Sequence, residues 1–97
     1  MKDISVEEFI QRLEDGEKVF RNIAVEDYSF SLAGFQLDGF EFSDSFINIL
    51  FSNCSFKGSK FIRCNLKCIS FTGCDLSECE ISECAVESLE IVDCKTD

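Results

Sequence analysis

Seven cysteines are the residues of this chain best suited to chemistry, because a thiolate can bind a metal, attack a substrate or form a disulfide. The sequence contains no histidine, so no cysteine has the imidazole base that most thiol nucleophiles use. Six cysteines are separated by multiples of five residues: Cys54, Cys64, Cys74, Cys79, Cys84 and Cys94. Tetrahedral zinc sites use closely spaced pairs that converge on one point. A constant spacing of five residues indicates a structural repeat instead.

The repeat is clearest in the large apolar residues, which stand at every fifth position: Phe46, Phe51, Phe56, Phe61, Leu66, Phe71, Leu76, Ile81, Val86 and Ile91. A second inward series, mostly small, lies two places before each of them from Phe51 onward and continues to Cys94: Ile49, Cys54, Ser59, Cys64, Ile69, Cys74, Cys79, Cys84, Leu89 and Cys94. A helix repeats near 3.6 residues and a strand near 2, so neither keeps a period of five. The pattern predicts a chain that turns a corner every five residues and points both series at a common axis.

Three units carry a family resemblance. Residues 64–68, 74–78 and 79–83 (CNLKC, CDLSE and CEISE) resemble the A-(D/N)-L-x-x units of pentapeptide-repeat proteins, with cysteine in place of alanine. The resemblance covers Phe30 to the C-terminus. It implies an all-β solenoid: a right-handed quadrilateral β-helix with four pentapeptides in each coil, and therefore about three coils here.

Charged residues give an independent estimate of the coil length. At an offset of twenty, the charges from Lys57 onward form only opposite-sign pairs: Lys60/Glu80, Arg63/Glu83, Lys67/Glu87 and Asp75/Lys95. An offset of fifteen also creates like-sign pairs, such as Asp75/Glu90. Opposite charges on neighbouring strands stabilise a stack and like charges destabilise it. The charges therefore favour twenty residues in a coil.

The repeat continues toward the N-terminus with one irregularity, because only four residues separate Phe42 from Phe46. We expect either a corner near Ser43-Asp44 that is one residue short or a bulge of the chain there. We divide the single domain into residues 1–29, a helix cap and lead-in strand, and residues 30–97, the β-helix. Val19-Phe20 and Ile23-x-Val25 are candidates for a further strand or partial coil.

The first residues have a different pattern. Ser5 followed by Glu8 forms a capping box, and the next apolar residues make a single helical stripe: Val6, Phe9, Ile10 and Leu13. We predict a short α-helix over 6–15, ended by Gly16. The end of a β-helix exposes backbone groups and an apolar cross-section, so the helix is expected to cap it. The alternative is a helix that binds a partner.

In the predicted β-helix six cysteines point inward and Cys68 points outward at a corner. Buried cysteine often acts as a small apolar residue. The odd number of cysteines and the absence of an export signal favour reduced thiols in the cytoplasm, and we expect no metal and no cofactor. Stacked residues lie ~4.8 Å apart, within reach of a disulfide. Three pairs remain candidates for oxidation: Cys54/Cys74, Cys74/Cys94 and Cys64/Cys84.

Charge excludes several classes of partner. The formal net charge is −10, and residues 64–97 hold eight acidic residues against Lys67 and Lys95. Nucleic acids and anionic membranes attract the opposite sign, and no apolar run reaches the length of a membrane span. The sequence has no Gly-rich phosphate loop and no nucleophile beside a base, so we do not expect the chain to be an enzyme. A protein partner with a basic surface fits this charge.

Two function hypotheses follow. The first is a non-enzymatic solenoid that acts as a protein-interaction or structural module. The second comes from the resemblance. Some pentapeptide-repeat proteins mimic DNA, bind DNA gyrase and protect it from fluoroquinolones, and the resemblance implies the same role for this chain. Those relatives are about twice as long and dimerise through a C-terminal helix that this sequence lacks.

The last coil is expected to expose apolar side chains, because only Lys95-Thr96-Asp97 follow the last inward cysteine. The exposed set is predicted to be Ile81, Val86, Leu89 and Ile91. We therefore predict a weak homodimer through the C-terminal coil, opposed by Glu87, Glu90 and Asp93 and favoured by salt.

Overall fold

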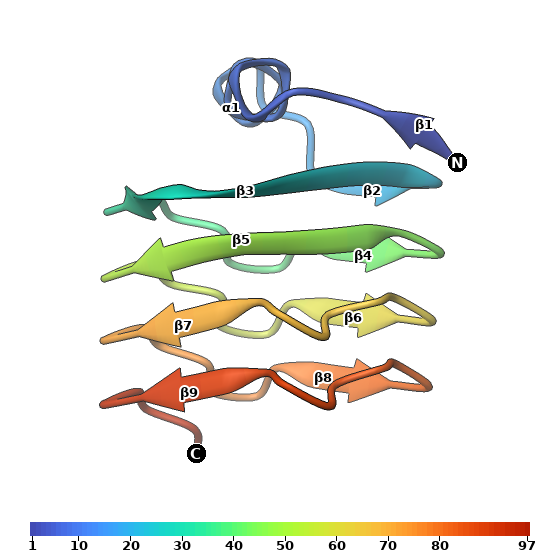
Figure 1. Cartoon of the computed structure of the whole chain (residues 1–97). Coiled ribbons are helices and arrows are strands. Elements are labelled where there is room, and N and C mark those ends of the chain that lie inside the picture. Colours follow the sequence, from blue (N-terminus) through green and yellow to red (C-terminus); the bar gives the residue numbers. More distant parts are fainter.

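The computed structural model describes residues 1–97 as a right-handed parallel β-helix with one short helix at its N-terminal end (Figure 1). The elements in chain order are β1 (Lys2–Asp3), α1 (Val6–Glu14), β2 (Val19–Arg21), β3 (Ile23–Ala33), β4 (Glu41–Ser43), β5 (Phe46–Ser52), β6 (Lys60–Ile62), β7 (Ser70–Thr72), β8 (Glu80–Ser82) and β9 (Glu90–Val92). The fold predicted from the period of five is confirmed.

Two parallel sheets run along the length of the molecule. One has the order β1-β3-β5-β7-β9 and the other the order β2-β4-β6-β8, so successive coils stack without exchanging places. Each coil contains one strand of each sheet, and Figure 1 shows four such coils below α1 and β1. We number them coil 1 (19–40), coil 2 (41–59), coil 3 (60–79) and coil 4 (80–97).

The coil length predicted from the charges is confirmed in the C-terminal half. Phe51 pairs with Phe71 and Phe71 with Ile91, and Lys60 pairs with Glu80, each at an offset of twenty residues. Asp75 lies opposite Lys95 in the same register. The strict period of five therefore extends over coils 3 and 4.

Large apolar side chains form continuous columns inside the coils. Six of the residues predicted to face inward are buried: Phe51, Phe56, Phe61, Leu66, Phe71 and Leu76. On one face the rings of Phe20, Phe42 and Phe61 stack at centroid distances of 5.4 and 5.0 Å. Offset stacking of this kind adds to the stabilisation from burial. One apolar column thus joins the coils.

Phe46 is the exception among the predicted inward residues, and its placement corrects the sequence analysis. Phe46 pairs with Asn65, and the inward place above Leu66 is taken by Ile47, which is 1% exposed. Phe46 is half-buried on the outer surface. The period of five was extended one unit too far toward the N-terminus.

The short unit also lies elsewhere than predicted. Phe42 to Phe46 matches Phe61 to Asn65, so the corner at Ser43-Asp44 has its normal length. The missing residue falls between Phe46 and Leu50, which are paired with Asn65 and Ser70. There β5 runs straight where coil 3 makes a turn, and an extended chain spans the same distance with fewer residues.

The side chain of Asn48 replaces part of the missing turn. Its Oδ1 accepts a hydrogen bond from the Cys68 backbone N–H at 2.6 Å, and its Nδ2 donates to the Asn65 carbonyl oxygen at 3.2 Å. Asn48 is 1% exposed, so both of these polar groups need partners inside the protein. The amide thereby connects the straight strand to the turn of the coil that follows.

The β-helix begins earlier than predicted. β2 and β3 form a complete coil from Val19, and β3 spans the proposed start at Phe30 without a break. The structure thus has four coils rather than about three, and about five turns when β1 and α1 are included. The candidate strands at Val19-Phe20 and Ile23-x-Val25 belong to this coil, as β2 and the start of β3. The period of five did not extend to them because β3 shifts register between Asp27 and Ser31, leaving Tyr28–Phe30 as a bulge.

The predicted helix cap is present. Ser5 Oγ accepts a hydrogen bond from the Glu8 backbone N–H at 3.0 Å. Phe9 is fully buried, with its ring centroid 5.3 Å from that of Phe20 in coil 1. Beside it Arg12 lies over the Phe20 ring and forms an ion pair with Glu17. The helix therefore extends the aromatic column and covers the N-terminal end of the β-helix.

The small inward position performs the same task in successive coils. Ser45 and Ser59 accept hydrogen bonds from the backbone N–H groups of Ile23 and Phe40 in the coil before them. Cysteine sulfurs take this role lower down, as Cys84 does for the N–H of Cys64. Residues at this position therefore need a short side chain with a hydrogen-bonding atom, which both serine and cysteine supply.

The corners place residues at positive φ. Gly34, Asn53, Gly73 and Asp93 form one such column, with φ between 52° and 76°. A Cβ added to Gly34 would have open space around it, but a Cβ added to Gly73 would lie 2.6 Å from Asn53 Oδ1. Gly73 is thus required both by its backbone conformation and by its neighbour.

Replacing Phe71 with alanine should cost ~3–5 kcal/mol of unfolding free energy, the range for a buried phenylalanine. Phe71 is fully buried, 5.8 Å from the Phe51 ring and 5.2 Å from the Phe56 ring. Urea unfolding followed by circular dichroism measures the loss. Phe30→Ala is the matched control, since Phe30 is 44% exposed. Equal losses in the two variants would contradict the assigned column.

Replacing Gly73 with alanine should destabilise the protein more than replacing Gly58. Both residues have φ near +65 to +70°, so both variants carry the strain of an alanine at positive φ. Only Gly73 has a contact that the new Cβ would violate. Thermal unfolding of the two variants isolates the contact, and a Gly73→Ala/Asn53→Gly double variant should recover the difference, because glycine removes the Asn53 amide and tolerates the positive φ of 52° at that position.

Candidate functional site: the exposed end of coil 4

The apolar columns end unprotected in coil 4. Ile81, Val86 and Ile91 are 40, 42 and 44% exposed, whereas the residues above them in coil 3 are at most 1% exposed. Leu89 is half-buried in the same layer. We call Ile81, Val86, Leu89 and Ile91 the apolar end. These are the four residues that the sequence analysis proposed for a dimer contact, and all four lie in the last coil.

One exposed apolar residue here was not named by the sequence analysis. Val92 is 46% exposed and follows Ser52 and Thr72 by register on the outer surface. An apolar residue at an outward position of the repeat was the signal that could have identified it. Val92 widens the apolar end onto the neighbouring face.

β8 and β9 are the last strands of their sheets in this chain, so each has one edge without a partner strand. Backbone N–H and C=O groups along such an edge remain available for pairing. Figure 1 shows both strands at the opposite end of the molecule from α1. The two ends of the β-helix are therefore different: a helix covers one, and the other presents backbone groups and apolar side chains together.

Carboxylates surround the apolar end. We call Glu80, Glu83, Glu87, Glu90 and Asp93 the acidic rim; all five are exposed. Coil 4 contains six acidic residues and a single cation, Lys95. The cations that face this rim lie on its other side, in coil 3, where Lys67 Nζ is 3.8 Å from Glu87 Oε2. The acidic rim thus has basic residues on the side of coil 3 and none on the free side of coil 4.

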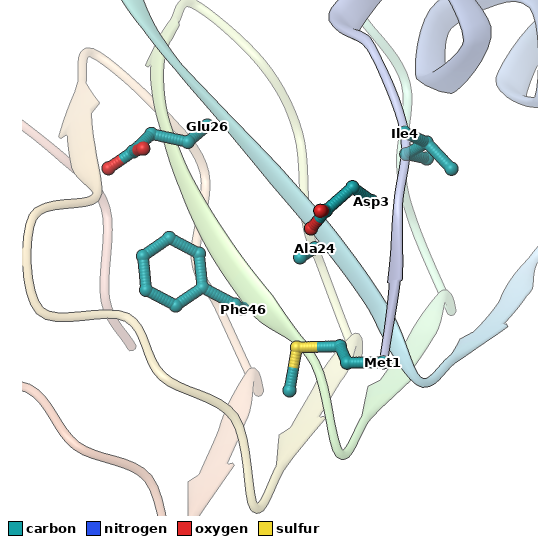
Figure 2. A pocket seen from close by; sticks show the side chains of 6 residues that line it. All are labelled: Met1, Asp3, Ile4, Ala24, Glu26 and Phe46. Carbon is teal, nitrogen blue, oxygen red and sulfur yellow. The ribbon is translucent and has the colours of Figure 1, made fainter.

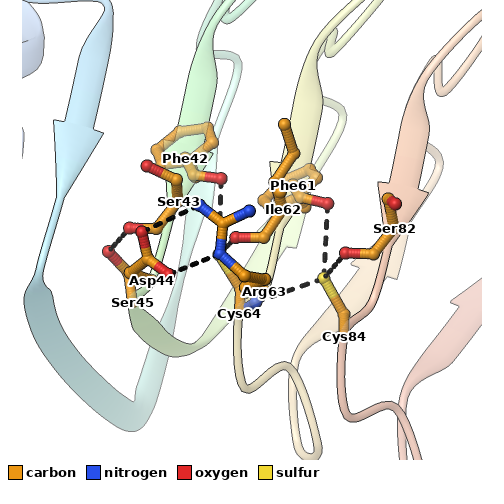
Figure 3. A network of polar contacts seen from close by, with 10 residues as sticks. All are labelled: Phe42, Ser43, Asp44, Ser45, Phe61, Ile62, Arg63, Cys64, Ser82 and Cys84. Carbon is orange, nitrogen blue, oxygen red and sulfur yellow. Dashed lines mark hydrogen bonds and ion pairs between the residues drawn. The ribbon is translucent and has the colours of Figure 1, made fainter.

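Arg63 shows how such charges are arranged between coils. Its guanidinium makes a two-point contact with Asp44 in coil 2, with Nε–Oδ1 and Nη2–Oδ2 distances of 2.7 and 3.1 Å (Figure 3). The hydrogen bond from Arg63 lowers the pKa of the Asp44 carboxyl. Sequence analysis paired Arg63 with Glu83, but the side chain turns to the coil above. Glu83 lies below it without an ion-pair contact.

The cysteines are held as structural groups. Cys84 Sγ lies 3.3 Å from the carbonyl oxygens of Phe61 and Ser82 and accepts the Cys64 N–H at 3.3 Å (Figure 3). Cys94 has the same arrangement with Phe71 and Cys74. All seven cysteines are free thiols, and Cys68 is the exposed one, as predicted. No group of three or more Cys, Asp or Glu side chains is placed to hold a metal ion.

A surface groove of about 470 Å³ lies at the other end of the molecule. Figure 2 shows its lining residues: Met1, Asp3, Ile4, Ala24, Glu26 and Phe46. It contains the exposed carboxylates of Asp3 and Glu26 and an apolar floor, without a nucleophilic or basic side chain. The displaced Phe46 ring forms part of this floor.

Stability should fall as pH rises from about 9 to 11. Burial raises the pKa of the Cys64, Cys74 and Cys79 thiols from 9.0 to about 11. A thiol whose pKa is raised by folding favours the folded state below its unfolded pKa, and that contribution disappears as pH passes through the folded value. Urea unfolding between pH 7 and pH 11 measures the effect. Cys64→Ala should reduce the slope of the profile, because it removes one of these three thiols, and an unchanged slope would contradict the assignment.

Comparison with known proteins supports the same fold. The family model for pentapeptide repeats matches residues 45–85 in eight copies. These residues contain the end of coil 2, all of coil 3 and the start of coil 4. A search of curated proteins found no significant match. The structure contains no helix with the length and hydrophobicity required to cross a membrane.

Proposed function

Because residues 45–85 are pentapeptide repeats within a β-helix that is capped at one end only, we propose that this chain is a non-enzymatic interaction module that docks proteins through the exposed end of coil 4. Proteins built from such repeats are generally structural or interaction modules. The observation that carries the proposal is the coincidence of unpaired strand edges and exposed apolar side chains in one layer.

The chemistry of the rest of the surface supports an interaction role over catalysis. The buried thiols are protonated at neutral pH and bonded to backbone carbonyls, so they are poor nucleophiles. The groove at the N-terminal end offers carboxylates without a complementary acid or base. An exposed apolar patch with a polar border is the usual mark of a protein contact.

A second copy of the chain is the simplest protein that fits the apolar end. Two ends related by a two-fold axis would pair their strand edges and bury both apolar layers, and the closed symmetry would stop further growth. The same axis would bring two acidic rims together. The dimer is therefore weak at low salt and favoured when salt screens the carboxylates.

Sedimentation velocity at several protein concentrations tests docking through this end. We expect monomers at low salt and a growing dimer fraction at high salt and high concentration. Ile91→Asp places a charge in the apolar end and should abolish the dimer. Val19→Asp is the matched control, because Val19 is a strand residue that is 48% exposed in coil 1.

Two outcomes would contradict the proposal. A strict monomer under all conditions would remove self-docking, and a dimer that tolerates Ile91→Asp would place the contact elsewhere. The alternative of DNA gyrase binding rests on the family resemblance alone. A supercoiling assay with added chain separates it, since loss of gyrase activity would favour that role.

A further inference from the structure

The charges of successive coils alternate in sign along two columns. In the first, Glu41 in coil 2 pairs with Lys60 in coil 3, and Lys60 pairs with Glu80 in coil 4. In the second, the corner residue Asp44 in coil 2 binds Arg63 in coil 3, and Glu83 follows in coil 4. Both columns read acid, base, acid, and both end on a carboxylate of the acidic rim.

A third position adds to this arrangement. Lys67 in coil 3 contacts Glu87 in coil 4 at 3.8 Å. The rim residues Glu80, Glu83 and Glu87 therefore have the spacing of three and four residues that Lys60, Arg63 and Lys67 have one coil above. The segment that covers these carboxylates within the molecule has the form K-x-x-R-x-x-x-K.

On the free side of coil 4 the same carboxylates have no cation. The backbone edges of β8 and β9 are unpaired there, and the apolar end lies between them. A partner strand that continues the alternation would add backbone hydrogen bonds, cover apolar side chains and place cations ~4.8 Å from the rim. A second copy of this chain would supply the backbone hydrogen bonds and cover the apolar side chains. Its own acidic rim, however, would bring carboxylates rather than cations.

From this geometry we infer that the end of coil 4 accepts a basic segment of a partner protein that pairs with β8 as an additional parallel strand and then turns the corner at Glu83 with the coil, with Lys or Arg at positions i, i+3 and i+7 opposite Glu80, Glu83 and Glu87. The inference rests on the proposed function, since it names the partner of the same docking end. Opposite charges on adjacent strands select both the partner and its register.

The test uses a synthetic peptide with blocked ends that copies residues 60–67 with serine in place of Cys64, KFIRSNLK. A control peptide of identical composition has the three cations adjacent to one another. Titration into ¹⁵N-labelled chain at low salt should shift the amide signals of 80–92. We expect the control peptide to bind at least fivefold more weakly, and binding of both peptides to fall as salt rises.

Variants of the chain separate register from net charge. Glu80→Gln/Glu83→Gln/Glu87→Gln should weaken binding of the first peptide at least tenfold. The matched control is Glu7→Gln/Glu8→Gln/Glu14→Gln, which removes the same charge from the exposed side of α1. Thermal unfolding confirms that both variants keep the fold, because exposed ion pairs contribute little to stability.

The outcomes distinguish the two proposals. Equal binding of the two peptides, equal loss in the two triple variants, or signal shifts on other faces would overturn the charge register. If the register fails while Ile91→Asp still abolishes the salt-favoured dimer, docking through the end of coil 4 stands. If Ile91→Asp has no effect on self-association and the peptide does not bind, both proposals are wrong.

Discussion

Register between coils is the constraint on which this structure depends. Every residue lies one strand spacing from its counterpart in the next coil, so one position of the repeat becomes a column that runs through the molecule. Aromatic rings gain from this when they stack on rings, as Phe42 does on Phe61 at 5.0 Å. Charged side chains in one column stabilise the stack only when those of successive coils have opposite signs. A single sequence offset therefore has to satisfy packing, backbone hydrogen bonds and electrostatics together, and in coils 3 and 4 the offset of twenty does so.

The same constraint explains which parts of the fold the sequence predicts. Where the period of five is strict, the inward residues follow directly, because any other register would expose a phenylalanine. Where the chain departs from five, the pattern alone does not show how the departure is absorbed. Phe46 and Ile47 are both apolar, and the choice between them depends on Asn48, whose amide fits the turn of the next coil. That contact joins residues twenty apart and has no local signature. The bulge at Tyr28–Phe30 concealed the first coil for the same reason.

The cysteines show how a repeat suppresses the chemistry of a reactive residue. At the small inward position a side chain must be short, tolerate burial and take part in hydrogen bonds with the adjacent coil. Serine and cysteine both do this, and Ser45 above Cys64 and Cys84 occupies one column with them. Burial raises the pKa of the Cys64 thiol to about 11, so its nucleophilic thiolate is scarce at neutral pH. Their regular spacing is thus the spacing of the fold, and the candidate site had to be sought where the columns end.

The regular part of a β-helix does not limit the number of its coils, because each coil presents a strand edge, an apolar layer and a row of charges on which another coil can stack. At the N-terminal end the chain resolves this with a helix whose Phe9 continues the aromatic column and whose outer side is polar. At coil 4 Ile81 and Ile91 replace the rings of Phe61 and Phe71 above them, Val86 replaces the larger Leu66, and carboxylates become dense. Smaller apolar residues reduce the area left in water, and a rim of like charge resists uncontrolled stacking of identical chains. Both features weaken binding to a like end without removing the backbone edge, so in the proposed role the surface selects its partner by charge while it keeps the capacity to add a strand.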